Sequence, residues 1–174
     1  MNKLLVVVDY QNDFVDGSLG FPKAVELHER ICEKIQSYWT EGQTIVFTLD
    51  THEPDYMQTQ EGRNLPVPHC IRGTRGHELY GRVQNFSLVC EKFEKGTFGS
   101  DLLLAYLQKK SFETIELVGL VSNICVISNA ILVKTAQPEA QIVVDASCTA
   151  SFDPILNEKS LDIMEGLQIK VTNR

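Results

Sequence analysis

The sequence predicts an α/β fold with three layers, in which a doubly wound, mainly parallel sheet of about six strands lies between two layers of helices. Short β-branched, apolar runs alternate with longer amphipathic stretches along the chain. Most of these runs are apolar at every position, as expected when both faces of a parallel sheet are covered. This alternation implies right-handed β-α-β units within one sheet.

The predicted strands are residues 4–8, 44–49, 87–90, 114–121, 141–144 and 168–172. The predicted helices are residues 24–40, 100–110, 123–135 and 154–166. In the first helix Val25, Ile31 and Ile35 recur at helical spacing, and Gly42 follows as a stop signal. Since 174 residues are about the length of one domain, we expect residues 1–174 to form a single domain.

Composition excludes several classes of function. The formal charge is −7, from 16 basic and 23 acidic residues, which argues against a nucleic-acid partner or an anionic membrane surface. The apolar run at residues 4–8 ends at Asp9 and is too short for a signal peptide or a membrane span. The five cysteines contain no C-x-x-C pair, so we expect free thiols in a reducing cytoplasm. They are Cys32, Cys70, Cys90, Cys125 and Cys148.

Residues 51–82 form an interval without a sustained period. It contains prolines, glycines and residue types that bind metals. A long irregular loop in a compact domain is usually functional, and we interpret this one as a metal-binding insertion.

Ligands of open α/β sheets bind at the carboxyl ends of the strands, so the residues that end the predicted strands belong together. They are Asp9, Asp50, Lys92, residues 122–125 and Asp145. An acid, a lysine and a thiol at one edge can form a nucleophilic site.

Cys125 is predicted at the start of a helix, where the helix dipole would lower the pKa of its thiol. Asp9 is suited to exchange a proton with it, and Lys92 to stabilise the thiolate. Lys95 competes with Lys92 for this role on composition alone. The plainer alternatives are a buried structural cysteine, a turn-initiating aspartate and a solvated lysine.

A second group consists of Asp50, His52, Glu61 and His69. Two imidazoles and two carboxylates suit one divalent ion such as zinc, iron or manganese. Cys70 is an alternative ligand, and exposed loop histidines are the alternative interpretation.

Five stretches together resemble the isochorismatase-like cysteine hydrolase superfamily, and within it the nicotinamidases. They are Val7-Val8-Asp9-Tyr10-Gln11-Asn12-Asp13-Phe14, Asp50-Thr51-His52, Pro68-His69-Cys70-Ile71-Arg72-Gly73-Thr74, Lys92 and Gly119-Leu120-Val121-Ser122-Asn123-Ile124-Cys125-Val126. The resemblance covers almost the whole chain.

The resemblance implies a catalytic triad of Asp9, Lys92 and Cys125, with Lys92 preferred over Lys95 by its spacing to Phe98. It also implies a non-proline cis peptide bond at Val121–Ser122. The backbone N–H groups of Val121 and Cys125 would then form the oxyanion hole.

The metal ligands implied by the resemblance are Asp50, His52 and His69, with Glu61 in place of a second loop histidine. Zinc is the expected ion. An aromatic residue that such proteins often carry before Pro68 is missing, because the chain reads Leu65-Pro66-Val67 there. Phe14 and Phe98 are therefore the expected substrate-binding residues, with Tyr106 as a helper.

The activity implied is hydrolysis of nicotinamide to nicotinate and ammonia through a thioester, by a dimer or tetramer. Another small-amide or N-carbamoyl hydrolase is the alternative, and isochorismate hydrolysis is disfavoured. A non-catalytic flavodoxin-like binding module is more distant, because residues 11–17 form an acidic loop unsuited to phosphate.

Overall fold

The computed structural model describes residues 2–174, and its strands form one parallel sheet. Within those residues the sheet has six strands in the order β3-β2-β1-β4-β5-β6. The strands are β1 (Lys3–Val8), β2 (Thr44–Asp50), β3 (Glu91–Lys95), β4 (Thr114–Leu120), β5 (Gln141–Ala150) and β6 (Lys170–Thr172). The order reverses between β1 and β4, so the sheet is doubly wound and the predicted fold class is confirmed.

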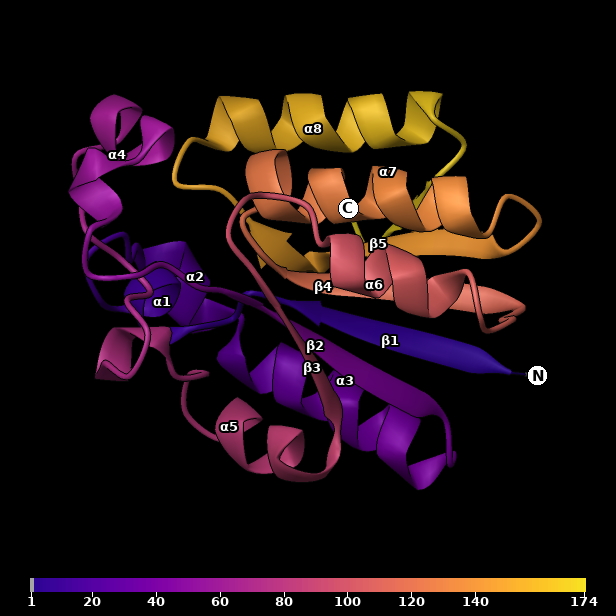
Figure 1. The fold of residues 1–174 in the computed structure, drawn as a ribbon. Coiled ribbons are helices and arrows are strands. Elements are labelled where there is room, and N and C mark those ends of the chain that lie inside the picture. The colour runs from indigo at the N-terminus through magenta and orange to yellow at the C-terminus, as the bar shows by residue number, and fades with distance from the viewer. Residues whose placement is uncertain (1) are drawn as a thin grey trace.

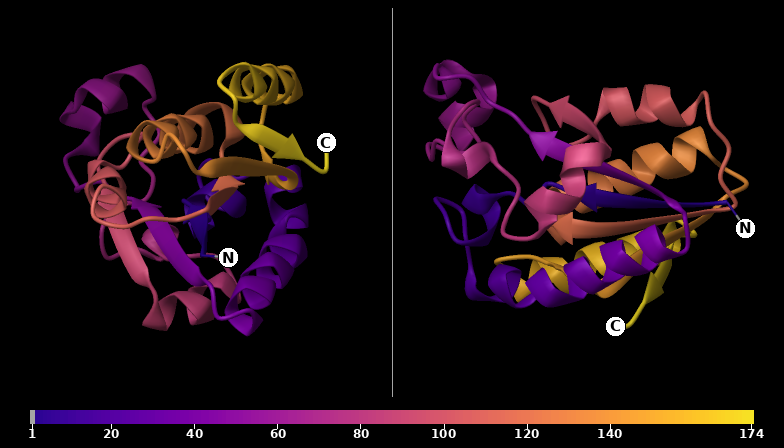
Figure 2. Two further views of the ribbon diagram at one scale, coloured as in Figure 1. Left: turned by 90° about the vertical axis from the view of Figure 1, so that its right-hand side faces the viewer. Right: turned by 90° about the horizontal axis from the view of Figure 1, so that it is seen from below.

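Helices cover both faces of the sheet (Figure 1). One layer contains α6 (Asp101–Leu107), α7 (Ile127–Ala136) and α8 (Pro154–Gly166), and the other contains α3 (His28–Thr40) and α5 (Val83–Phe86). The view in Figure 2 from the end where the N-terminus lies shows α7 and α8 on one side of the strands and α3 on the other. No helix within residues 2–174 has the length and apolar character needed to cross a membrane.

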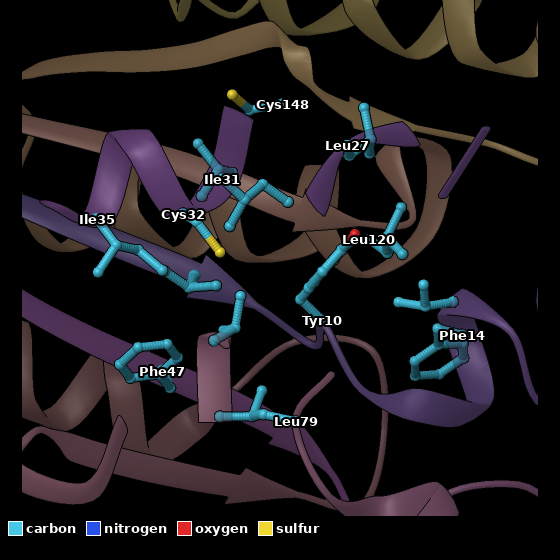
Figure 3. Packing of buried hydrophobic residues seen from close by; sticks show 14 of the residues in the cluster. Tyr10, Phe14, Leu27, Ile31, Cys32, Ile35, Phe47, Leu79, Leu120 and Cys148 are labelled. Carbon is cyan, nitrogen blue, oxygen red and sulfur yellow. The ribbon is translucent and has the colours of Figure 1, made fainter. Parts of the chain in front are cut away.

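The core consists of two clusters, one on each face of the sheet. Leu5 and Val7 of β1 belong to the cluster under α3, together with Ile31 and Ile35 (Figure 3). The alternate positions of β1, including Val6, belong to the cluster under α6 to α8. This explains why β1 is apolar at every position from residue 4 to residue 8, since each face of the strand is buried by helices.

The prediction of a strand at residues 87–90 is wrong. Ser87–Val89 is a short 3₁₀ turn (η3), and Leu88 and Val89 are 69% and 74% exposed. The third strand is Glu91–Lys95, which lies at the edge of the sheet and pairs only with β2. An edge strand exposes much of its surface and therefore carries charged residues. Because the sequence of β3 has no apolar run, it was not predicted as a strand.

Several other boundaries differ from the prediction, two of them with consequences for the description of the fold. Strand β5 continues to Ala150, so Asp145 lies in the middle of the strand and not at its carboxyl end. The helix predicted at residues 24–40 is divided into α2 (Pro22–Glu26) and α3 at Leu27.

Asp145 takes part in a buried ion cluster under α3. Lys34 Nζ lies 2.7 Å from both Asp145 Oδ2 and Glu116 Oε1, and Tyr38 Oη donates to Glu116 Oε2 at 2.7 Å. This cluster attaches α3 to β4 and β5. Burial opposes ionisation of Asp145, but hydrogen bonds from Lys34 and its neighbours outweigh it and hold the pKa below the ordinary 3.8.

Replacing Lys34 with alanine is expected to lower the free energy of unfolding by about 3–5 kcal/mol, because two buried carboxylates lose their shared cation. Urea unfolding at pH 7 measures this loss. The depressed pKa of Asp145 means that its contribution is complete above its unfolded pKa and disappears as the pH falls through the folded value. The deficit of the variant should therefore shrink in acid. The exposed Lys3–Glu41 pair supplies a control, and Lys3→Ala should hardly move the midpoint.

Candidate active site

The carboxyl ends of four adjacent strands bring an acid, a lysine and a thiol together. Asp9 follows β1, Asp50 ends β2, Lys95 ends β3, and Cys125 lies in the turn after β4. All four side chains are buried, with exposed fractions of 5% or less. The site thus lies at the switch point of the sheet, where α/β folds place their ligands.

Lys95 is the centre of this cluster. Its Nζ lies 2.6 Å from Asp9 Oδ2 and 3.3 Å from Asp50 Oδ1, and it donates to Cys125 Sγ at 3.6 Å. Lys95 Nζ also donates to the Thr97 carbonyl at 2.9 Å. Burial disfavours the ammonium form, but the negative charge of Asp9 and its neighbours outweighs it and raises the pKa of Lys95. The lysine therefore stays charged.

The prediction that Lys92 joins Asp9 and Cys125 is corrected by this geometry. Lys92 is exposed, three positions before the end of β3. The error follows from the misplaced strand: once β3 is known to run to Lys95, reasoning from strand ends selects Lys95 directly.

Asp9 is held by its backbone and by a neighbour on β2. Its φ is +44°, in the left-handed region that non-glycine residues rarely adopt, as at many functional sites. Thr48 Oγ1 donates to Asp9 Oδ1 at 2.6 Å, which leaves Oδ2 facing Lys95. One carboxylate oxygen is thus fixed and the other is directed at the reactive cluster.

Cys125 lies in a π-helical turn, Ser122–Val126 (η4), which precedes α7. A cis peptide bond joins Leu120 and Val121, and not Val121 and Ser122 as predicted. The prediction was one residue late because β4 ends at Leu120, not at Val121. Gly119 has φ +113°, and a Cβ there would lie 2.0 Å from the Val8 carbonyl oxygen, so only glycine fits where β4 approaches β1.

The direction of the thiol pKa is opposite to the prediction. Burial raises the pKa of Cys125 well above its usual value, and the nearby Asp9 carboxylate adds to the increase. Burial likewise raises the pKa of Asp9, although Lys95 opposes the effect. Cys125 therefore remains a neutral thiol in the free protein, and Asp9 is a stronger base than an exposed aspartate.

Asp50 connects the thiol cluster to a second group of side chains. Its Oδ2 lies 3.1 Å from His52 Nε2 and 3.3 Å from His69 Nε2. Glu61, on the short helix α4 (Gln60–Asn64), places Oε1 at 3.6 Å from His52 Nε2 and 3.8 Å from His69 Nε2. The structure thus brings together all four predicted ligands.

These spacings fit one metal ion. Ligand atoms about 2.1 Å from an ion at tetrahedral angles lie about 3.4 Å apart, within the 3.1–3.8 Å range of the four carboxylate–imidazole distances. The ligand atoms of Asp50, His52 and His69 all lie within 4.8 Å of one another, and Glu61 adds a fourth carboxylate contact to the two histidines. His69 Nδ1 donates to the Val67 carbonyl at 2.8 Å, which leaves Nε2 free to bind a metal. Burial and the charge of Asp50 raise the pKa of Glu61, as expected for a carboxylate that lies close to another one.

The loop that carries these ligands is braced by the side chains of residues 11–13. Gln11 Nε2 donates to the Asp50 carbonyl at 2.9 Å, and its Oε1 accepts from the Asp50 N–H at 2.8 Å. Asp13 Oδ2 accepts from the Cys70 N–H at 2.8 Å. Gln11 and Asp13 therefore hold the backbone of the site in place, and the contact with Cys70 is made through its backbone N–H group.

Both clusters open into one cavity of about 400 Å³. Its polar lining comes from Asp50, Glu61, His69 and Cys125, and the rest is apolar. The apolar lining includes the predicted Phe14 and Phe98, together with Leu19, Leu65, Val121, Ile124 and Phe152.

Three aromatic side chains differ from the sequence-based expectation. Phe152, which lies after β5 and is 61% exposed, lines the cavity and was not predicted. Tyr56 was also missed, and its ring lies 4.7 Å from that of His52 and 5.0 Å from that of His69. Tyr106 packs against Phe93 and does not line the cavity.

Replacing Glu61 with glutamine is expected to weaken zinc binding by at least about a hundredfold, because loss of supporting groups alone costs 10- to 100-fold. Competition against a coloured chelator measures the affinity. Glu53→Gln is the matched control, since Glu53 is exposed and pairs with Arg72. Equal affinities for Glu61→Gln and the control would show that three side chains hold the ion without Glu61.

Comparison with known proteins identifies the family of the chain. The isochorismatase domain family matches residues 3–174. The isochorismatase family protein PncA of Bacillus subtilis is 32% identical over 167 residues, covering 88% of each chain. The crystal structure of nicotinamidase/pyrazinamidase PncA from Bacillus subtilis has a TM-score of 0.85 at 31% identity, covering 98% of this chain and 99% of the other. N-carbamoylsarcosine amidase from Thermoplasma acidophilum has a TM-score of 0.81 at 25% identity, covering 98% and 95%.

Proposed function

Since this chain belongs to the isochorismatase domain family, we propose that it is a cysteine-dependent amidase that hydrolyses nicotinamide to nicotinate and ammonia. The observation that carries the proposal is that the Cys125 thiol lines one cavity together with three of the four candidate metal ligands, which are Asp50, Glu61 and His69. Asp50 belongs to both groups, since it contacts His69 and Lys95. A flat aromatic amide with a ring nitrogen suits such a cavity, because its amide group can face the Cys125 thiol while its ring nitrogen faces the metal-binding side chains.

In the first half of the reaction, Asp9 takes the thiol proton of Cys125, and the thiolate forms a C–S bond to the amide carbonyl carbon. Lys95 stabilises the thiolate through its 3.6 Å contact. The backbone N–H groups of Val121 and Cys125 hold the oxyanion. Asp9 then returns the proton to the amide nitrogen as the C–N bond breaks, and ammonia leaves.

In the second half, Asp9 deprotonates a water molecule, which attacks the thioester carbonyl. The C–S bond breaks, the thiol takes back its proton, and nicotinate leaves. Because Asp9 alternates between base and acid, its buried position with a raised pKa is useful in both steps.

Asp50, His52, Glu61 and His69 are the side chains that would hold one zinc, iron or manganese ion. When bound, the ion supplies a Lewis acid for the pyridine nitrogen. Phe14, which packs against His69 at 5.5 Å between ring centroids, and Phe98 form walls for the substrate ring.

A second candidate is hydrolysis of an N-carbamoyl compound, which the likeness to N-carbamoylsarcosine amidase supports. The four clustered metal-binding side chains favour nicotinamide, since a carbamoyl substrate has no ring nitrogen to anchor.

Ammonia release by zinc-loaded protein tests the proposal, with nicotinamide and N-carbamoylsarcosine as parallel substrates. Nicotinamide should be hydrolysed at least a hundredfold more efficiently, and removal of the ion should raise its KM. Release of ammonia from the carbamoyl compound alone would favour the second candidate, and unchanged turnover after complete metal removal would contradict the role of the ion.

We further infer that the enzyme works in the cytoplasm as a dimer or tetramer and returns nicotinate to NAD synthesis. A reducing compartment suits a mechanism that depends on the free Cys125 thiol. Sedimentation of the purified chain tests the oligomeric state.

A further inference from the structure

Asn129 is a fully buried side chain, one helical turn after Cys125, that contacts neither the thiol nor the cavity. Its amide makes three hydrogen bonds to backbone groups. Nδ2 donates to the Cys125 carbonyl at 2.8 Å and to the Phe98 carbonyl at 3.1 Å, while Oδ1 accepts from the Ser100 N–H at 3.0 Å. One side chain therefore connects the nucleophile turn to residues 96–100.

Residues 96–100 join β3 to α6 and carry two parts of the site. The Thr97 carbonyl accepts the hydrogen bond from Lys95, and the Phe98 ring is a wall of the cavity. At the end of the loop Ser100 Oγ caps α6 by accepting from the Leu103 N–H at 3.1 Å. A shift of this loop would thus move the substrate wall relative to Cys125.

Few side chains hold the loop in place. It contains Gly96 and Gly99, and a Cβ at Gly99 would lie 2.7 Å from Leu132 Cδ1 on α7. The loop therefore approaches α7 closely there, and Asn129 makes the hydrogen bonds that define its distance from the helix. Phe98 itself is 45% exposed, so its own packing contributes little.

We propose that Asn129 is a positioning residue, which holds the Phe98 wall at a set distance from the Cys125 thiol. A substrate ring seated against Phe98 then presents its amide carbonyl to the sulfur. Displacements of about 1 Å at a reacting centre can cost as much as 100-fold in rate. Phe98 is a wall that seats the ring and does not touch the reacting atoms, so loss of the brace should act chiefly on KM. The identity of the substrate rests on the proposed function, whereas the brace does not.

Gln137 is a matched control at the other end of α7. Its Nε2 donates to the Leu107 and Lys110 carbonyls at 2.7 and 2.8 Å, and its Oε1 accepts from the Phe112 N–H at 3.4 Å. It makes the same three kinds of bond, but to residues 107–112 at the opposite end of α6 from Phe98, outside the cavity lining. A variant at each position separates loss of stability from loss of positioning.

The test compares Asn129→Leu and Gln137→Leu in the zinc-loaded protein. Both should lower the urea midpoint. Only Asn129→Leu should speed hydrogen exchange in residues 96–100 and raise KM roughly tenfold, with a smaller change in kcat. Asn129→Asp, which keeps the acceptor and the volume but loses both donors, replaces the leucine variant if that variant does not fold. The proposal would be overturned if the Asn129 variants kept the hydrogen-exchange rates and the KM of the wild-type protein. It would also be overturned if Gln137→Leu raised KM as much as Asn129→Leu.

A double-mutant cycle tests whether Asn129 affects substrate binding through Phe98. If Asn129 acts through Phe98, the effect of Asn129→Leu on KM should vanish in a Phe98→Ala background, and full persistence there would contradict the proposal. A wild-type protein that releases no ammonia from nicotinamide would refute the proposed function, and the exchange comparison would still decide the role of Asn129.

Discussion

Replacing Lys95 with alanine is expected to lower kcat by about a thousandfold or more, because the residue stabilises the thiolate and orients Asp9. The same substitution at Lys92 should change kcat by less than about twofold, since Lys92 is exposed at the edge of the sheet. Steady-state ammonia release measures both variants. Lys92 is a well-matched control for Lys95, because the two lysines lie on the same short strand.

Lys95→Ala also leaves Asp9 and Asp50 without their shared cation, so the variant needs a control for folding. Lys95→Met keeps most of the side-chain volume and removes only the charge. Circular dichroism shows whether each variant is folded. Full activity in a folded Lys95→Met protein, or a thousandfold loss in Lys92→Ala, would contradict the assignment.

Cys125→Ala should abolish hydrolysis, with a loss in kcat of about 10⁴-fold or more, because no other group can form the thioester. The alanine variant should still bind nicotinamide, since Asp50, Glu61 and His69 remain in the cavity. Calorimetric titration measures this binding. In the wild-type protein, acid quenching during turnover should trap a nicotinoyl group on the peptide that contains Cys125.

Cys90 provides the matched thiol control. It is half-buried, hydrogen bonded to the Phe86 carbonyl and outside the cavity. Cys90→Ala should keep the wild-type kcat and the trapped acyl group. Turnover that survives in Cys125→Ala would refute the covalent mechanism whatever the result at Cys90.

The raised pKa of Cys125 changes how its reactivity is understood. A helix-start cysteine is expected to exist as a thiolate, but full burial beside Asp9 favours the neutral thiol. In the proposed mechanism, proton transfer from Cys125 to Asp9 is therefore a step of the reaction. The 2.6 Å contact between Lys95 and Asp9 keeps the base and the cation together while this proton moves.

The layered α/β fold and three of the four side chains at the strand ends could be predicted from the sequence. Buried parallel strands must be apolar on both faces, so β1, β2 and β4 can be read from composition. Asp9 and Asp50 directly follow or end such strands, and Cys125 lies in the turn after another. The four side chains that the structure gathers as candidate metal ligands could also be named from the sequence, because their types are characteristic of metal ligands.

The three-dimensional structure was needed to identify the lysine of the site, the way in which the loop of residues 51–82 brings Glu61 to the histidines, and the positions of Phe152 and Asn129. Each of these depends on contacts between segments far apart in the chain. Strand β3 is the clearest case: it lies at the edge of the sheet and pairs with one neighbour, so its residues carry charges and no apolar run marks its end. Lys95 is recognised only from its pairing with β2, which places its Nζ between Asp9, Asp50 and Cys125.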